Sequence, residues 1–229
     1  MVKRNRKFGM PNLSHTPAVQ DYLKAIHQLG GSRGGVSTSA VAERLEVSPA
    51  SVSGMLKRLH EQGLVSHKRY QGVKLTRRGT REAIEMIRHH RLIELYLAKV
   101  VGMPWDKVHE EADALEHVIS EDLESRLDEL LGYPTEDPHG HPIPTAALDL
   151  DEGDYPSLAA VDPGEYVVRR VEDRDADLLR HLDGLGLRPG ARVLVEERIP
   201  YRGGVRICVG SSEHIVGPDA AGAVGVAAA

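Results

Sequence analysis

The first third of the chain carries helix and strand signals in a fixed order, which limits the possible folds more than any other feature. Apolar residues recur every three to four positions over 16–29, which predicts an amphipathic helix with Pro17 in its first turn. A short helix follows at about 38–45, and a Ser-Pro pair begins a third helix at 48–63. Alternating apolar and polar residues then predict two strands, joined by a turn, over 64–76.

Three helices followed by a strand pair are typical of a winged helix-turn-helix. In that fold the N-terminal residues of the last helix meet base edges in the major groove of DNA, and the strand pair forms the wing. We therefore predict a DNA-binding surface made of Ser48, Ala50, Ser51, Ser53, Lys57, Arg58, Lys68 and Arg69. Its small side chains allow close approach to bases, whereas its basic side chains suit phosphates. A Ser-Pro-Ala-Ser run also begins any ordinary helix well, but the basic wing at a fixed distance favours DNA.

Charge is divided unevenly along the chain. The whole protein has a net charge of −5, yet residues 1–91 hold 17 Lys and Arg against 6 Asp and Glu, whereas residues 92–229 hold 12 against 28. A basic first third fits phosphate binding, and an acidic remainder cannot lie along DNA. Charged residues on solvated helix faces are the alternative explanation, but they would account only for a smaller difference in net charge between the two parts of the chain. The basic stretch Met1–Phe8 is predicted to be a disordered arm.

Other features of the composition narrow the class of protein. No run approaches the ~20 apolar residues of a membrane span, and no apolar segment follows the basic start, so we expect neither membrane association nor a secretion signal. The one cysteine, Cys208, can form no internal disulfide. We therefore expect a cytoplasmic protein.

Four potential metal ligands lie close together in the middle of the chain. The pattern over 104–132 predicts one helix, on which His109, Asp113, Glu116 and His117 would fall within an arc of roughly 100°. They flank an apolar stripe, so they should be partly buried, and buried charged groups need partners. An ion-pair network produces the same pattern, so spacing alone leaves both a metal site and such a network open.

The rest of the chain predicts a fold that is mainly α-helical with some β structure. A long helix is expected from Thr76 to about Val101, and a Pro- and Gly-rich segment of low helix content over 132–164. Short strands at 166–171, 192–196 and 206–209, with a helix at 175–185, indicate a small SH3-like barrel. The predicted domains are therefore a winged helix-turn-helix at 1–78, a helical domain at 79–144, a linker at 145–164 and an SH3-like domain at 165–229.

Four short motifs accompany the winged helix: His90-Arg91-Leu92, the run 107–112, Glu116-His117-Val118 and the run 138–144. Together with the winged helix they resemble the diphtheria-toxin-repressor family of iron- and manganese-dependent transcriptional regulators. The match covers nearly the whole chain. It implies a DNA-binding domain, a helical metal-binding and dimerisation domain, and a C-terminal SH3-like (FeoA-like) domain.

The resemblance also implies two metal sites in each chain. One site takes its ligands from Asp21, Asp113, Glu116 and His117. The other takes His90, Glu94 and His109 and is completed from the SH3-like domain, where the nearest candidates are Glu172 and Asp175. Asp175 matches in an ungapped alignment, but the family's next ligand position falls on Leu178, which cannot bind a metal.

Departures from the family pattern bear on the choice of metal. Iron-type members have Met and Cys where this chain has Asp21 and Asp113, and carboxylates favour Mn²⁺ over softer ions. Manganese-type members have a Glu one turn after Asp21, where this chain has Lys24, and a cation cannot bridge two metal ions. His139 and His141 stand in a Pro-Gly loop and are expected to be surface residues.

These observations favour a homodimeric, Mn²⁺-responsive repressor of metal-uptake genes that binds a pseudo-palindromic operator in double-stranded DNA. An Fe²⁺-responsive repressor is the alternative within the same class. A carboxylate–histidine metalloenzyme is the alternative of another class, although the sequence lacks paired Glu-x-x-His motifs on two helices. A third alternative is a winged-helix regulator that binds no metal.

Overall fold

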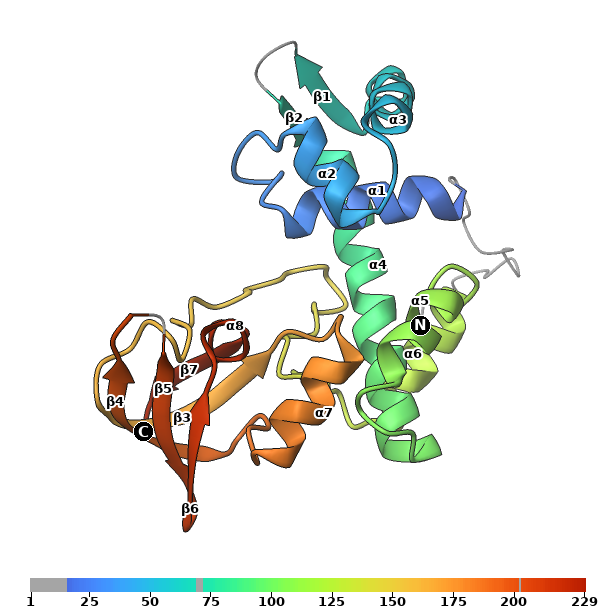
Figure 1. The fold of residues 1–229 in the computed structure, drawn as a ribbon. Coiled ribbons are helices and arrows are strands. Elements are labelled where there is room, and N and C mark those ends of the chain that lie inside the picture. Colours follow the sequence, from blue (N-terminus) through green and yellow to red (C-terminus); the bar gives the residue numbers. More distant parts are fainter. Residues whose placement is uncertain (1–15, 69–71, 202) are drawn as a thin grey trace. The chain divides into compact units, whose positions relative to one another are not determined.

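A computed structural model describes residues 16–68, 72–201 and 203–229 (Figure 1). They fall into two compact units. The first comprises residues up to His90 with 114–129 and 144–150, and the second comprises 91–113, 130–143 and 151–229. Among the described helices, none combines the length and apolar character needed to cross a membrane.

The N-terminal part of the first unit is a winged helix-turn-helix, as predicted. Its elements are α1 (Pro17–Gln28), α2 (Thr38–Arg44), α3 (Pro49–Glu61), β1 (Val65–Lys68) and β2 (Gly72–Leu75). Ser37 Oγ accepts a hydrogen bond from Ala40 N, and Ser48 Oγ accepts one from Ser51 N, so both helices of the helix-turn-helix begin at a serine cap. Buried leucine, isoleucine and valine side chains from all three helices and both strands form its core.

The wing is fastened to the loop before α2. Val36 and Val73 exchange two backbone hydrogen bonds of 2.9 and 2.8 Å. Gly72 has a φ of 73°, and a Cβ atom there would lie 2.5 Å from the Val36 carbonyl oxygen. Glycine is therefore required at this position, both for the left-handed backbone and for the close approach of the two chains.

The helical part differs from the prediction in one respect that matters for the site. The single helix predicted over 104–132 is wrong: α5 (Val108–Leu115) ends early, and α6 (Glu121–Leu130) follows after a turn. Ser120 begins α6, because its Oγ accepts a hydrogen bond from Leu123 N at 3.2 Å. The four ligand candidates of this region therefore do not share one helix face, since Glu116 and His117 lie in the turn.

The long helix α4 (Arg77–Tyr96) continues as the π-helix η1 (Leu97–Val101) and stops at Gly102, whose φ is 77°. Arg88, buried near its middle, joins α4 to α6. Its guanidinium donates to Glu124 Oε1 at 2.5 Å, to Asp128 Oδ2 at 2.7 Å and to the Pro144 carbonyl at 2.6 Å.

The second unit contains an antiparallel five-stranded sheet in the order β6-β5-β4-β3-β7, which confirms the SH3-like domain (Figure 1). Its elements are β3 (Gly164–Val171), α7 (Ala176–Gly184), β4 (Arg192–Ile199), β5 (Gly204–Val209), β6 (Ser212–Val216), α8 (Pro218–Gly222) and β7 (Val224–Ala228). Residues 132–163 form no helix or strand, in agreement with their Pro and Gly content. Even so, Leu158 and Val161 are buried in the core of the sheet domain.

Candidate metal centres and DNA-binding surface

The first turns of α3 present the side chains that were predicted to contact DNA. Ser48, Ala50, Ser51, Ser53, Lys57 and Arg58 are all exposed. The apolar residues between them face the core, so the exposed set forms one face of the helix. Ser53 Oγ donates to the Pro49 carbonyl at 2.9 Å, so this hydroxyl is already engaged within the helix. Lys68 ends β1, and Arg69 lies outside the described residues.

The first candidate metal centre consists of Asp21, Glu116 and His117. One ligand atom from each lies within 4.8 Å of the others. His117 Nε2 is 3.0 Å from Asp21 Oδ1 and 3.8 Å from Glu116 Oε1. Its other ring nitrogen, Nδ1, is 2.9 Å from Gln20 Oε1, so a proton on Nδ1 is held by Gln20 and Nε2 is directed at the two carboxylates. The hydrogen bond to Asp21 raises the pKa of His117.

Glu116 connects this centre to a buried cation. Its Oε2 accepts a hydrogen bond from Lys24 Nζ at 2.7 Å and lies 2.6 Å from His90 Nδ1. Burial alone would raise the pKa of Glu116, but His90 and Lys24 outweigh it and lower the pKa. Glu116 is therefore a carboxylate with one oxygen beside Lys24 and the other facing His117. The ammonium stands beside Glu116 Oε2, where a second ion bound by this carboxylate would have to lie.

Replacing Lys24 by Glu is expected to raise the number of Mn²⁺ ions bound per chain by one. The change removes the ammonium from Glu116 and supplies a further carboxylate ligand. Equilibrium dialysis followed by elemental analysis measures the count. Lys24→Met is the matched control, since it removes the cation without adding a ligand and should leave the count unchanged. An unchanged count in Lys24→Glu would show that the ammonium does not limit the site.

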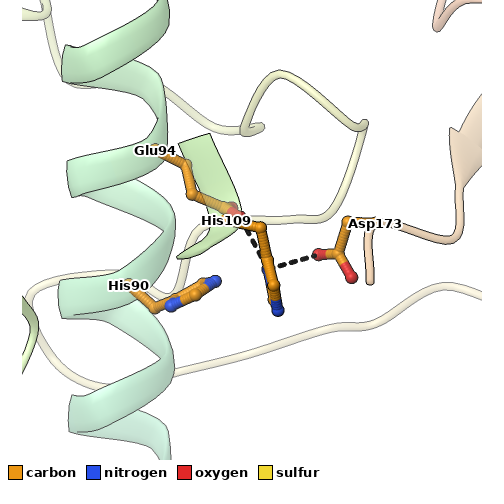
Figure 2. Close-up of side chains that lie close together, drawn as sticks. All are labelled: His90, Glu94, His109 and Asp173. Atoms are coloured by element: carbon orange, nitrogen blue, oxygen red, sulfur yellow. Dashed lines mark hydrogen bonds and ion pairs between the residues drawn. The ribbon is translucent and has the colours of Figure 1, made fainter. Parts of the chain in front are cut away.

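The second candidate centre contains Glu94, His109 and Asp173, which Figure 2 shows turned toward one another. His109 Nδ1 is 3.1 Å from Glu94 Oε1 and 3.8 Å from Asp173 Oδ2. His90 stands one helical turn before Glu94 on α4. Asp113, which the resemblance assigned to the first centre, lies on α5 in the second unit, where it is half exposed and its Oδ2 is 3.6 Å from His109 Nε2.

The SH3-like domain contributes Asp173 to this centre and not the two residues considered from the sequence. Glu172 is exposed. Asp175 caps α7, where its Oδ1 accepts hydrogen bonds from Asp177 N at 2.9 Å and Leu178 N at 3.0 Å. A sequence signal for Asp173 existed: it follows the buried strand residue Val171 by two positions, and residues two apart in extended chain point to the same side.

A further group lies beside this centre and was missed. The expectation that His139 and His141 are surface residues is wrong, because His139 is fully buried and His141 is largely buried. The loop is held inward by Asp137, whose Oδ1 accepts from the backbone N–H of both histidines at 2.8 and 2.9 Å. Gly140 has a φ of 84°, and a Cβ atom there would lie 2.0 Å from the Arg169 carbonyl oxygen. Only glycine allows the loop to pack this closely on β3.

Imidazoles and carboxylates are packed closely together in this group, so each shifts the pKa values of its neighbours. Burial lowers the pKa of His139, but Glu94, Asp137 and Asp173 outweigh it and raise the pKa to about 9. The pKa of His141 is likewise raised by Asp137 and Asp173 against burial. Burial raises the pKa of Asp173, yet the neighbouring histidines bring it below the usual range for an aspartate.

Comparison with known proteins finds three family models along the chain. The model "Iron dependent repressor, N-terminal DNA binding domain" matches residues 15–73. The model "Iron dependent repressor, metal binding and dimerisation domain" matches 76–145, and the FeoA domain matches 157–228.

Relatives are similar over most of their length. The iron-dependent repressor IdeR of Mycobacterium tuberculosis is 36% identical over 211 residues, which is 86% of this chain and 90% of that protein. The diphtheria toxin repressor of Corynebacterium efficiens is 37% identical over 183 residues, or 75% of this chain and 80% of the relative.

Solved structures with the same fold have been determined with different bound metals. A manganese-dependent transcriptional repressor in complex with manganese superimposes with a TM-score of 0.86 at 38% identity, covering 92% of this chain and 100% of that one. The structure of ScaR with bound Zn²⁺ has a TM-score of 0.80 at 32% identity, with 92% of this chain and 99% of that one covered.

Proposed function

Because this chain belongs to the diphtheria-toxin-repressor (DtxR/MntR) family of metal-dependent transcriptional repressors, we propose that it is a Mn²⁺-responsive repressor of metal-uptake genes. Its relatives are DNA-binding regulators and not enzymes, so the metalloenzyme interpretation is set aside. The regulator without metal is set aside for the same reason, since the family is metal-dependent.

The proposal rests on one observation: ligand atoms of Asp21, Glu116 and His117 lie within 4.8 Å of one another. Asp21 lies on α1, the first helix of the DNA-binding part, whereas Glu116 and His117 lie in the turn between α5 and α6. By sharing one ion, the three residues would join α1 to that turn. Metal would thus select the arrangement of the DNA-binding part that fits an operator, from among those that the metal-free protein samples.

The donor atoms support Mn²⁺ as the ion. The first centre offers two carboxylates and one imidazole, with no sulfur among its described residues. Hard oxygen ligands suit Mn²⁺, whereas thiolate or thioether ligands move preference toward softer ions. Fe²⁺ is the second candidate, because relatives of this chain include iron-dependent repressors.

A homodimer on a pseudo-palindromic operator is proposed as the binding form. The family's helical domain is a dimerisation domain. In the first unit, Val118 and Leu123 are 66% and 46% exposed, and apolar side chains of this size gathered near one turn suit a contact with a second copy. Two copies related by a two-fold axis would present the two α3 helices about one turn of DNA apart, ~34 Å.

Operator binding is expected to require Mn²⁺ and to weaken steeply with salt, because the basic groups of the DNA-binding part neutralise phosphates. Gel shifts with and without a chelator, across a salt series, measure both effects. A protein that makes about six phosphate contacts should lose on the order of 10³-fold in affinity between 50 and 200 mM salt. Equal binding in the presence of chelator would overturn the proposed function.

The metal preference is expected to move when Asp113 is replaced by Cys, the residue of iron-type members at this position. A thiolate favours softer ions, so the ratio of Mn²⁺ to Fe²⁺ activation should fall. The ratio is measured anaerobically as the metal concentration giving half-maximal operator binding, with Asp113→Glu as the control that keeps the carboxylate. If the wild type already responds better to Fe²⁺ than to Mn²⁺, the protein is an iron sensor.

A further inference from the structure

Gly54 lies in the interior of α3, where glycine is unfavourable. Glycine loses more backbone freedom than alanine when a helix forms, so it destabilises a helix interior. No described residue requires glycine here, because the Gly54 backbone is helical and an added Cβ atom would meet nothing within 4 Å beyond the helix's own backbone. A requirement for glycine at this position therefore comes from a molecule that approaches the helix from outside.

Gly54 also lies in the middle of the face that α3 turns to solvent. It follows Ala50 by one helical turn, so the two residues share a face, and both are exposed. The buried residues of the helix lie on the opposite side: Val52, Leu56 and Leu59. The first turns of this helix enter the major groove in a winged helix-turn-helix, so Gly54 lies where base edges come closest.

The serine hydroxyls around Gly54 are already hydrogen-bonded within the helix. Ser48 Oγ accepts from Ser51 N at 3.1 Å and lies 2.9 Å from Ser51 Oγ. Ser53 Oγ donates to the Pro49 carbonyl. This face therefore presents mainly carbon atoms to a base. Among the four bases, only thymine carries an apolar group, its C5-methyl, at the major-groove edge, whereas the edges of the others present hydrogen-bonding atoms.

We propose that Gly54 determines operator specificity by leaving room for the C5-methyl group of a thymine in each half-site. The Ala50 methyl, one turn earlier, forms an apolar wall of this space. Lys57 and Arg58, one turn later and also exposed, are placed to hold the neighbouring phosphates. The proposal rests on the proposed function, because it names a base that the DNA-binding surface of the regulator reads.

Replacing Gly54 by Ala tests the proposal, because the new methyl group fills the space that the thymine methyl would occupy. The probe is a DNA duplex selected from a random library by the full-length wild type with Mn²⁺. Gly54→Ala should weaken binding to this duplex about tenfold, which is within the range for one mismatched base pair. Gly184→Ala is the matched control and should leave the affinity unchanged, since Gly184 ends α7 in the second unit, is exposed and would also gain a Cβ atom in open space.

Removing the methyl group from the DNA identifies the thymine. Each thymine of the duplex is replaced in turn by deoxyuridine, which lacks only the C5-methyl group. At one position in each half-site, the wild type should lose about fourfold in affinity, which corresponds to one buried methyl group. At the same position, Gly54→Ala should bind the uracil duplex at least as well as the thymine duplex, since its own methyl group takes the space.

Thermal unfolding of the metal-free protein separates this role from a structural one. Gly54→Ala should raise the midpoint by about 2–4 °C, since alanine favours the helix, so the variant should be more stable and yet bind DNA more weakly. Unchanged affinity, a lowered midpoint, or an equal loss on thymine and uracil duplexes at every position would overturn the role of Gly54. A wild type that binds DNA equally with chelator present would instead overturn the proposed function itself.

Discussion

Replacing Asp21 by Ala is expected to abolish Mn²⁺-dependent operator binding while the protein stays folded. Asp21 is the α1 residue of the first centre, and its Oδ1 lies 3.0 Å from His117 Nε2. Loss of a residue that merely supports a metal ligand already reduces metal affinity about 10–100-fold, and loss of a ligand should cost at least as much. The Asp21 side chain is 44% exposed, and His117, which loses this partner, keeps its contact with Gln20, so the fold should persist.

The measurement is a gel shift across Mn²⁺ concentration, with thermal unfolding of the metal-free protein as the check on folding. Glu43→Ala on α2 removes another exposed carboxylate of the DNA-binding part and should leave metal dependence unchanged. Glu116→Ala should also abolish the response, but it leaves Lys24 buried without its carboxylate and will destabilise the fold as well. Wild-type metal dependence in Asp21→Ala would show that α1 is not tied through an ion.

The winged helix was predictable because its signals are local. Ser48 and Pro49 begin α3 through a cap and a fixed φ that operate within one turn, whatever the rest of the chain does. The end of the long helix at Gly102 follows from the left-handed backbone that glycine allows. Such features depend on residues within a few positions of one another, so the sequence displays them directly.

The break between α5 and α6 could have been predicted but was hidden by a competing pattern. The apolar residues Val108, Ala112, Leu115 and Ile119 keep helical spacing through the turn, so periodicity alone favours one helix. Ser120 followed by two acidic residues is the opposing signal, and the structure shows that this cap begins a new helix. The turn is further held by tertiary contacts, since the Glu116 carbonyl lies 3.2 Å from His89 Nδ1.

The burial of His139 was beyond local reasoning. A Pro-Gly loop is ordinarily on the surface, and the groups against which this one packs lie more than 25 residues away in sequence. The imidazole stacks on Trp105 with 5.6 Å between ring centroids, and Gly140 packs against the Arg169 carbonyl. Likewise, Asp173 joins Glu94 and His109 only because the strand that precedes it is placed by the whole sheet.

Replacing Arg88 by Met is expected to lower the free energy of unfolding of the first unit by about 3 kcal/mol. The Arg88 side chain is 4% exposed and is paired with Glu124 and Asp128, so its loss leaves two largely buried carboxylates facing an apolar group. Methionine fills a similar volume, so the effect comes from the lost ion pairs and the lost hydrogen bond to the Pro144 carbonyl. This loss of unfolding free energy lies at the lower end of the range for broken buried ion pairs, because Glu124 and Asp128 keep 14% and 15% of their side chains exposed.

Loss of the Arg88 ion pairs should also disturb the first metal centre, because α6 follows directly on the turn that contains Glu116 and His117. Thermal unfolding with chelator present should show the midpoint lowered by about 6–12 °C, since each kcal/mol moves it by about 2–4 °C in a chain of this size. Arg126→Met is the matched control: its pair with Glu129 is 72% and 61% exposed, and exposed pairs contribute about 0–1 kcal/mol. Equal midpoints for the two variants would mean that the Arg88 cluster does not hold α6 to α4, and that contacts of the turn itself, such as those with Lys24 and His89, fix it.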